Sequence, residues 1–360
     1  MTTMPGNLLL LSVCAAISAL ITFLSIRYAL RNALLDLPGQ RRSHSVPTPR
    51  GGGIGIVVVA MAAWATLLFD GHGVPFGGWL LPALAVVAVA GWIDDHRGLG
   101  VRVRLACHFL AAIALCLPIM RLLAFLFDVA MAASGHSSTK AMPLDPHAIL
   151  AFAASICIVA TVWSINLHNF MDGIDGLLAW QALFVFLALA WSTPGDGKLF
   201  LLACAAAVAG FLPFNFPRAK VFMGDIGSGT LGLLIAAGAI MQILSFRGSM
   251  YAGLIACSAF VVDTTCTLLS RMLGGRRWYS AHREHLYQWL ARSGFSHARV
   301  VAFYMAWNLC VNAPVLYMLD RAGSHSAGRE GALALAVYVL ALATWIAGKR
   351  WCLRQAWRIK

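Results

Sequence analysis

Charged residues are scarce in this sequence of 360 residues, which holds 27 Lys and Arg and only 14 Asp and Glu, or 11% in total. Soluble domains average about 25% charged residues. Hydrophobic residues make up 60% of the chain, so an ordinary water-soluble domain is excluded and most of the chain is expected to lie in lipid. Linkers and low-complexity stretches are also lacking. We therefore predict a single polytopic membrane domain over residues 1–360.

Motifs typical of several soluble enzyme and metal-protein classes are missing too. The nine cysteines are scattered and form no CxxC pair, so we predict neither a disulfide nor a zinc site. No Walker A pattern or GxSxG elbow occurs, so the common soluble P-loop and hydrolase folds are not supported. The net charge of +13 is distributed over separate loops, and we predict no binding to nucleic acid.

Long apolar runs predict the fold class, an all-α integral membrane bundle of about eleven (ten or eleven) transmembrane helices with cytoplasmic active-site loops. The first run lacks the positive flank and the short apolar core of a signal peptide, so we interpret it as a retained span. The runs cover residues 8–29, 52–69, 79–93, 105–127, 148–165, 177–193, 198–213, 227–245, 250–270, 299–319 and 331–348.

The distribution of basic residues predicts the orientation of the chain. If residues 30–50 face the cytoplasm, 21 of the 27 Lys and Arg lie on the cytoplasmic side. We therefore expect a multi-pass protein of the bacterial inner membrane, with a periplasmic N-terminus and a cytoplasmic C-terminus. Most of the unusual Asp, Asn and His residues fall on the cytoplasmic side as well, which indicates a metal and phosphate site there.

The segment GWIDDHRGLG carries two adjacent carboxylates, Asp94 and Asp95, at the end of the third apolar run. Adjacent side chains on a helix point about 100° apart, so the two cannot share one target atom equally. We expect divided roles, with one carboxylate at a reacting phosphate and the other at a basic side chain. The alternative is a pair of aspartates that only caps a helix end at the membrane interface.

The segment NLHNFMDGIDGL repeats a polar residue every three positions, at Asn166, Asn169, Asp172 and Asp175. The glycines between them allow a ligand to approach closely. Amide and carboxylate oxygens suit a hard cation such as Mg²⁺. The alternatives are an Asn–Asp turn between helices and a calcium site, although the spacing is not that of an EF-hand.

The segment PRAKVFMGDIGSG places Asp225 between glycines at the start of the eighth apolar run. The free amides of a helix N-terminus, together with Ser228, can face an anion. Asp225 can hold the cation that neutralises this anion. The alternative is an N-cap aspartate followed by small residues that serve helix packing.

The segment RRWYSAHREHLYQ is a candidate for binding diphosphate. A helix through it would put His282, His285 and Gln288 on one face, and Arg283 can grip phosphate oxygens. The alternative is an amphipathic helix that rests on lipid headgroups. A second basic segment, GQRRSHSVPTPRGGG, is equally compatible with binding to lipid phosphate and with charge that only sets the topology.

These motifs, in this order, resemble the polyprenyl-phosphate N-acetylhexosamine-1-phosphate transferases. The resemblance rests on GWIDD, NxxNxxDGIDGL, FMGDxGS and a His-containing loop, and it covers about residues 6–350. Members of this family transfer a sugar 1-phosphate from a UDP-sugar to a membrane polyprenyl phosphate, use Mg²⁺ and release UMP. The rival interpretation is a polytopic transporter or flippase of a lipid-linked or anionic substrate, but transporters typically show internal repeats and a binding site at the midplane.

The resemblance also implies roles for individual residues. It puts Asp225 and Asn169 at the metal, which is Mg²⁺ or alternatively Mn²⁺, and Asp175 where the uracil is recognised. It implies catalytic roles for Asp94, Asp95, Asp172 and His285. The substrate-binding residues that we expect are Asn166, Asp175, Arg104, Arg42, His44, Arg50, His282 and Arg283.

The loop AHREHLYQ differs from the His-rich loops of the best-known members. Together with PTPRGGG it resembles the branch that initiates O-antigen or other surface polysaccharide on undecaprenyl phosphate. That branch implies a 6-deoxy donor such as UDP-N-acetyl-fucosamine or UDP-N-acetyl-quinovosamine, or else UDP-GlcNAc, and we expect Leu286 or Tyr287 to meet the sugar methyl. The expected partners are undecaprenyl phosphate, a UDP-N-acetyl sugar and the bilayer, and a homodimer is compatible with this architecture.

Overall fold

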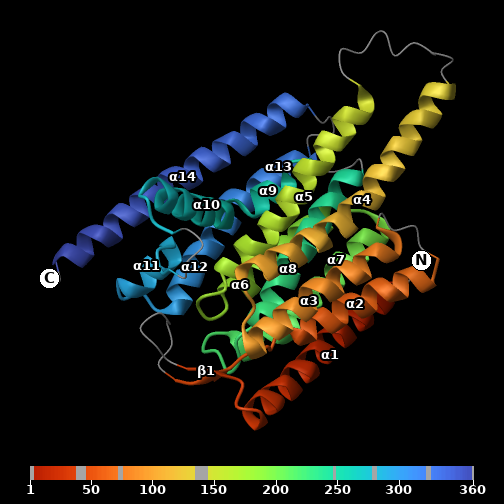
Figure 1. Ribbon diagram of the computed structural model, residues 1–360. Coiled ribbons are helices and arrows are strands. Elements are labelled where there is room, and N and C mark those ends of the chain that lie inside the picture. The colour runs from red at the N-terminus through yellow and green to blue at the C-terminus, as the bar shows by residue number, and fades with distance from the viewer. Residues whose placement is uncertain are drawn as a thin grey trace.

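Helices make up nearly all of the computed structural model, which describes residues 4–37, 46–71, 76–133, 145–245, 249–277, 282–321 and 326–358 (Figure 1). In chain order the helices are α1 Met4–Arg31, α2 Ile54–Phe69, α3 Leu80–Arg97, α4 Val101–Ala133, α5 Pro146–Phe170, α6 Leu177–Ser192, α7 Gly195–Asn215, α8 Gly224–Leu244, α9 Ala252–Ala256, α10 Ser258–Leu273, α11 Leu286–Arg292, α12 His297–Trp307, α13 Ala313–Arg321 and α14 Ala327–Arg358. A short 3-10 turn, Gly77–Trp79, precedes α3, and a π-helix, Asn308–Asn312, joins α12 to α13. Two short strands, β1 Leu35–Asp36 and β2 Thr48–Pro49, pair antiparallel.

The helices follow the predicted apolar runs, so the prediction of an all-α membrane protein is confirmed. Eight helical segments of the described chain are long and apolar enough to cross a bilayer. Three other predicted runs correspond to shorter apolar helices, namely α2 and α6 with 16 residues each and the pair α9 and α10. The count of eleven spans and their orientation stay predictions.

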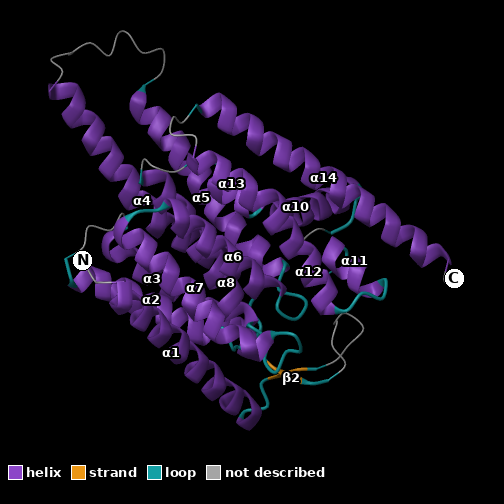
Figure 2. Cartoon of the chain, turned by 180° about the vertical axis from the view of Figure 1, so that it is seen from behind, coloured by secondary structure: helices purple, strands orange, loops and turns teal. Residues whose placement is uncertain are grey.

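Helix α8 occupies the centre of the bundle, where α3, α5, α6 and α7 surround it. In its most apolar stretch 78% of the residues are buried inside the protein, compared with 17% for α1, α5 and α14. A helix that is apolar all round is expected to be buried. The other three helices leave most of their apolar side chains exposed, as lipid-facing helices do, and α14 runs along the outer edge of the molecule (Figures 1 and 2).

One glycine lets α3 approach α8 closely. A Cβ atom on Gly91 would lie 2.5 Å from the backbone carbonyl of Asp225, which is too near for any other residue. Asp94 and Asp95 follow Gly91 by about one helical turn. The close approach therefore brings the GWIDD motif next to the FMGD motif, 130 residues further along the chain.

The ninth predicted run is broken into two helices at Cys257, and polar side chains satisfy the backbone at the break. The carbonyl oxygen of Ala256 accepts a hydrogen bond from Gln181 Nε2 at 2.9 Å. Asn308 Nδ2 in turn donates to Gln181 Oε1 at 2.7 Å, and Asn312 Nδ2 donates to Asn308 Oδ1 at 2.9 Å. A helix can break inside a bundle because such buried groups replace the missing backbone bonds.

Candidate active site

A polar cavity of about 240 Å³ lies at the end of the bundle where α3 and α5 end and α8 begins. Five of the predicted site residues line it, and they come from segments far apart in the sequence: Arg50, Asp95, Asp172, Asp225 and Arg283. The rest of the wall is formed by Asp36, Gly173, Ile174, Asn215, Phe222, Gly224, Gln288 and Ala291. The fold thus brings five of the sequence segments to one place.

Asp95 connects α3 to the first turn of α8. Its side chain is buried, and its two carboxylate oxygens accept hydrogen bonds from the backbone N–H groups of Asp225 at 3.0 Å and Ile226 at 3.2 Å. The first amides of a helix have no partner within the helix, and the helix dipole favours a negative charge next to them. The expectation that these amides face a bound anion is therefore wrong, because a carboxylate of the protein already occupies them.

The Asp94 side chain faces Arg104 of α4 and shares this guanidinium group with the Asp225 side chain of α8. Arg104 Nη1 lies 2.7 Å from Asp94 Oδ2 and 3.3 Å from Asp225 Oδ2, so a single guanidinium group bridges the two carboxylates. The backbone N–H of Leu99 also donates to Asp94. The two adjacent aspartates thus have separate partners, as the helical geometry of the motif predicts.

The Asp225 carboxylate and the Ser228 hydroxyl are oxygen groups that suit a hard divalent cation, and Asn169 would join them if its amide turned its oxygen toward Asp225. Asn169 Nδ2 donates to Asp225 Oδ1 at 2.7 Å and to Ser228 Oγ at 2.9 Å, so an amide, a carboxylate and a hydroxyl group meet at one point. Within the described ranges no three Asp, Glu, His or Cys side chains form a ready-made metal cage. This open arrangement suits Mg²⁺, which is usually held by one or two carboxylates together with phosphates of the substrate.

The loop between α5 and α6 brings Asp172, the first aspartate of the DGIDG motif, to the cavity. Burial, with smaller contributions from the charges of Asp95 and Asp175, raises the pKa of Asp172 to about 7. A carboxyl group with this pKa exchanges its proton close to neutral pH, which is where a general acid or base works best. Asp172 thus lines the cavity as a side chain that can gain or lose its proton near neutral pH.

The resemblance implies that Asp175 recognises uracil. In the structure Asp175 is in contact with His297, the first residue of α12. His297 Nδ1 lies 3.2 Å from Asp175 Oδ2 and 3.4 Å from the Asp175 backbone nitrogen. The sequence analysis missed His297, since a single histidine in a short polar segment gives no signal of its own. The contact shows that the start of α12 belongs to the surroundings of the site.

The histidine loop differs from the predicted arrangement. Helix α11 begins only at Leu286, so the prediction of one helical face shared by His282, His285 and Gln288 is wrong. Gln288 lines the cavity, but His285 is 2% exposed and stacks on Phe170 behind the wall. Burial lowers the pKa of His282 to about 4 and also lowers the pKa of His285, so both rings favour the neutral form. The structure therefore does not bring His285 to the cavity as a catalytic group.

Other predicted residues lie away from the cavity wall. Asn166 Nδ2 contacts His108 Nδ1 at 3.1 Å and donates to the Val162 carbonyl at 2.7 Å, inside the packing of α4 and α5. Leu286 and Tyr287 are buried and do not line the cavity, contrary to the expectation that they meet the sugar. Arg42 and His44 lie outside the described residues.

The lining also includes residues that the sequence analysis did not select, among them Asp36, Asn215 and Phe222. Asn215 joins two motifs, because its Oδ1 accepts from the Gly176 N–H at 3.0 Å and its Nδ2 donates to the Val221 carbonyl at 3.0 Å. Among these three, a sequence signal existed only for Phe222, which lies within the FMGD motif itself.

Comparison with known proteins identifies the family. Residues 78–243 match the model of glycosyl transferase family 4. The chain is 30% identical over 313 residues to a decaprenyl-phosphate N-acetylglucosaminephosphotransferase of Mycobacterium tuberculosis, covering 78% of this chain and 74% of that protein. This chain belongs to glycosyl transferase family 4, the polyprenyl-phosphate N-acetylhexosamine-1-phosphate transferases.

Other members of family 4 are similar over comparable lengths. A phospho-N-acetylmuramoyl-pentapeptide-transferase of Geobacillus thermodenitrificans is 31% identical over 281 residues, or 73% of this chain and 81% of that protein. An undecaprenyl-phosphate alpha-N-acetylglucosaminyl 1-phosphate transferase of Yersinia pestis is 25% identical over 351 residues, or 94% of this chain and 88% of that protein. The chain is thus an enzyme of the sugar-1-phosphate transferase type, and none of these relatives supports the transporter alternative.

The two aspartates of this family 4 enzyme should respond differently to removal of their charge. Asp95→Asn places an amide N–H group against the α8 amides, and leaving such a donor unpaired costs about 1–3 kcal/mol, so the thermal midpoint in detergent should fall. Asp94→Asn should lower the midpoint less, because its amide oxygen can still accept one of the hydrogen bonds made to Asp94, but it should lower kcat about 100-fold or more. Thermal unfolding and initial rates measured on both variants test this expectation. Equal losses of kcat with unchanged midpoints would contradict it.

The stability of the metal-free enzyme should fall as the pH rises toward neutrality. The folded protein holds the Asp172 proton up to a pH of about 7, whereas an unfolded chain releases it near pH 4, so the folded state loses this advantage as the pH rises between these values. Asp172→Asn should flatten the pH dependence of the thermal midpoint measured in EDTA. Asp128→Asn, which changes an exposed carboxylate, is the control. A slope that Asp172→Asn leaves unchanged would show that another group titrates.

Proposed function

We propose that the enzyme transfers an N-acetylhexosamine 1-phosphate from a UDP-sugar to undecaprenyl phosphate at the cytoplasmic face of the bacterial inner membrane. The observation that carries the proposal is the cavity at one end of the helix bundle, where Asp225, Asp172 and two arginines converge. A cavity at the end of a membrane-spanning bundle would let a lipid phosphate arrive from the bilayer and a nucleotide arrive from water. The relatives, which are named for decaprenyl phosphate and undecaprenyl phosphate, support the same reaction.

The reaction joins two anionic groups, so the site must neutralise charge. A phosphate oxygen of the lipid forms a bond to the sugar-bearing phosphorus of the donor, the bond from that phosphorus to the bridging oxygen breaks, and UMP leaves with the electron pair. We assign Arg50, Arg104 and Arg283 to the phosphate oxygens, since Arg50 and Arg283 line the cavity and Arg104 reaches Asp225 beside it. Arginine matches phosphate with paired donors.

Asp225 and Asn169 are the residues that would hold Mg²⁺. When bound, this ion supplies a Lewis acid that stabilises the diphosphate and the leaving UMP. We assign Asp94 to positioning the acceptor phosphate through the Arg104 guanidinium group that it binds, since both of its oxygens, like those of Asp95, already accept hydrogen bonds. Asp172 faces the same cavity and can accept a proton near neutral pH.

Release of UMP by the purified protein tests the reaction. With undecaprenyl phosphate, Mg²⁺ and a panel of UDP-N-acetyl sugars, UMP should form, EDTA should stop it, and Mg²⁺ or Mn²⁺ should restore it. Asp225→Asn should lower turnover about 100-fold or more, because the cation loses its charged ligand. Asp128→Asn, at the other end of α4 from Arg104, is the matched control and should keep normal turnover. Full activity of Asp225→Asn at millimolar Mg²⁺ would refute the metal assignment.

For the sugar, we propose a 6-deoxy N-acetylhexosamine such as N-acetyl-fucosamine or N-acetyl-quinovosamine, used to initiate O-antigen or another surface polysaccharide. The wall that α11 presents to the cavity combines the amide of Gln288 with the methyl group of Ala291. A small apolar group next to a hydrogen-bonding group suits a sugar that carries a methyl in place of a hydroxymethyl. Since an apolar pocket discriminates only about 10–200-fold for such a change, UDP-GlcNAc should be a poorer donor and not an inert one.

Gln288→His should change the choice of donor. The ratio of kcat/KM between a UDP-6-deoxy sugar and UDP-GlcNAc should shift by about tenfold, because the substituted side chain faces the sugar, while the Mg²⁺ dependence should stay the same. Trp289→Phe, on the same helix but outside the cavity lining, is the control. Equal loss on every donor would contradict the role of Gln288. Use of UDP-GlcNAc alone by the wild-type enzyme would contradict the 6-deoxy preference while leaving the transferase reaction intact.

A further inference from the structure

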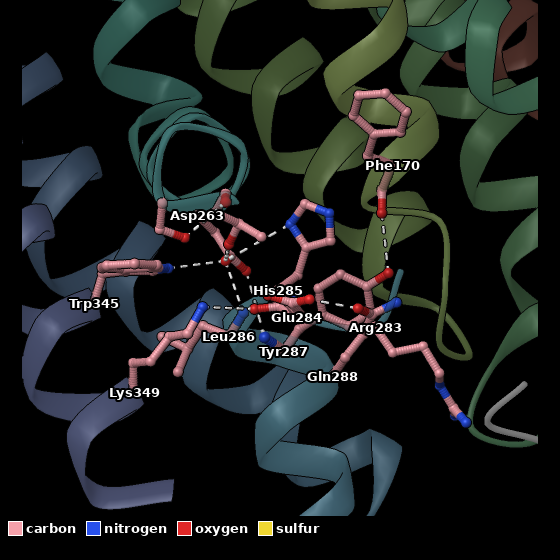
Figure 3. Close-up of polar contacts among 12 residues, drawn as sticks. Phe170, Asp263, Arg283, Glu284, His285, Leu286, Tyr287, Gln288, Trp345 and Lys349 are labelled. Atoms are coloured by element: carbon pink, nitrogen blue, oxygen red, sulfur yellow. Dashed lines mark hydrogen bonds and ion pairs between the residues drawn. The ribbon is translucent and has the colours of Figure 1, made fainter. Parts of the chain in front are cut away.

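Asp263 is a buried carboxylate of α10 that lies outside the cavity and yet contacts several elements around it (Figure 3). Its side chain is 1% exposed. Oδ1 accepts hydrogen bonds from the Leu286 N–H at 2.7 Å and from Trp345 Nε1 at 3.0 Å, and Oδ2 accepts from the Tyr304 hydroxyl at 2.7 Å and from the Tyr287 N–H at 3.4 Å. These donors belong to α11, α12 and α14. One carboxylate thus joins four helices.

The carboxylate fixes the place where α11 begins. The N–H groups of Leu286 and Tyr287 are the first two amides of this helix, and both donate to Asp263. Arg283 lies just before these residues and Gln288 just after them, and both line the cavity. The position of Asp263 therefore determines where the two lining side chains of this segment project.

Glu284, the residue before His285, is held by a second set of contacts. The Glu284 carboxylate is paired with Arg271, and its Oε2 lies 2.8 Å from Arg276 Nη1. Lys349 Nζ donates to the Glu284 carbonyl at 2.8 Å. The backbone on both sides of His285 is thus held by charged groups of α10 and α14, and not by the bilayer or the solvent.

The segment held by Asp263 touches the DGIDG loop directly. The Tyr287 hydroxyl donates to the carbonyl of Phe170 at 3.0 Å, at the end of α5 (Figure 3). A Cβ atom on Gly173 would lie 2.1 Å from this hydroxyl, so the two segments are packed as closely as a glycine allows. Asp172, which precedes Gly173, lines the cavity opposite Arg283 and Gln288. A continuous path of contacts therefore runs from Asp263 to the reacting groups.

We propose that Asp263 is a positioning residue for the transfer reaction. It holds the segment from Arg283 to Gln288 against the DGIDG loop, so that Arg283 and Gln288 close the donor side of the cavity. A charge serves this purpose better than an apolar side chain, because five donors converge on it, the fifth being the Thr267 hydroxyl at 3.3 Å. The proposal rests on the proposed function only in taking the ligand of that side to be the UDP-sugar.

The test replaces the carboxylate by a group of the same shape. Asp263→Asn keeps one acceptor oxygen but turns an NH₂ group toward two of the donors, so the segment should shift. We expect KM for the UDP-sugar to rise by about tenfold or more, with a fall in kcat, while KM for undecaprenyl phosphate and the Mg²⁺ dependence stay near wild type. A residue that serves only the fold would instead lower the active fraction and leave the donor KM unchanged.

Two further variants act on the same path without removing Asp263. Tyr287→Phe deletes the hydroxyl that donates to Phe170, and Tyr304→Phe deletes one donor to the carboxylate. Each should raise the donor KM less than Asp263→Asn does. Combining Tyr287→Phe with Asp263→Asn should raise it by less than the product of the two single effects, as expected for residues that act through one contact. These variants also decide the matter if Asp263→Asn does not fold.

Glu330→Gln is the matched control. Glu330 is also buried and accepts a hydrogen bond from the Ser249 hydroxyl at 2.7 Å, but it lies in the first turn of α14, far along the helix from Trp345 and Lys349. This variant should leave the donor KM unchanged. If wild-type protein releases no UMP from any UDP-sugar, the proposed function is wrong. If wild-type protein is active and neither Asp263→Asn nor the two tyrosine variants change the donor KM, the positioning role is overturned while the function stands.

Discussion

Two backbone amides at the start of α8 donate to one carboxylate, Asp95, and the other parts of the site are arranged around this contact. The contact is short because Gly91 lets α3 lie directly against α8. With α8 fixed, the Asp225 side chain meets Asn169 of α5, and Asp94 meets Arg104 of α4. A helix terminus that would otherwise attract an anion is thereby used to join the ends of four helices.

The C-terminal helices complete the cavity through a few buried polar bonds. Tyr287 contacts the end of α5, His297 contacts Asp175, and Asn308 contacts Gln181 in the interior of the bundle. Hydrogen bonds between buried groups are well suited to this role, since lipid offers little driving force for helices to associate through apolar contact alone. Loop geometry at the site therefore depends on contacts made inside the bundle as well as at its surface.

The sequence was sufficient to predict the parts of the structure that depend on local patterns. Each apolar run became a helix or a pair of helices, and the divergence of Asp94 and Asp95 follows from the helical turn angle. The start of α11 could not be predicted in this way, because a carboxylate 23 residues earlier in the chain captures the amide of Leu286. The contact of His297 with Asp175 spans 122 residues and has no local signal at all. Such pairings are set by how the helices pack.

Arg104 places a positive charge of the protein itself between two carboxylates of the site. Its guanidinium group lies between Asp94 and Asp225 and acts as an internal monovalent counter-ion. If Asp225 holds a divalent cation, as proposed, that cation would have to compete with this guanidinium group, and the released guanidinium would gain most where a phosphate could receive it. In that case the metal and a diphosphate would assist each other's binding, and a pre-formed metal–nucleotide complex would be favoured over either component alone.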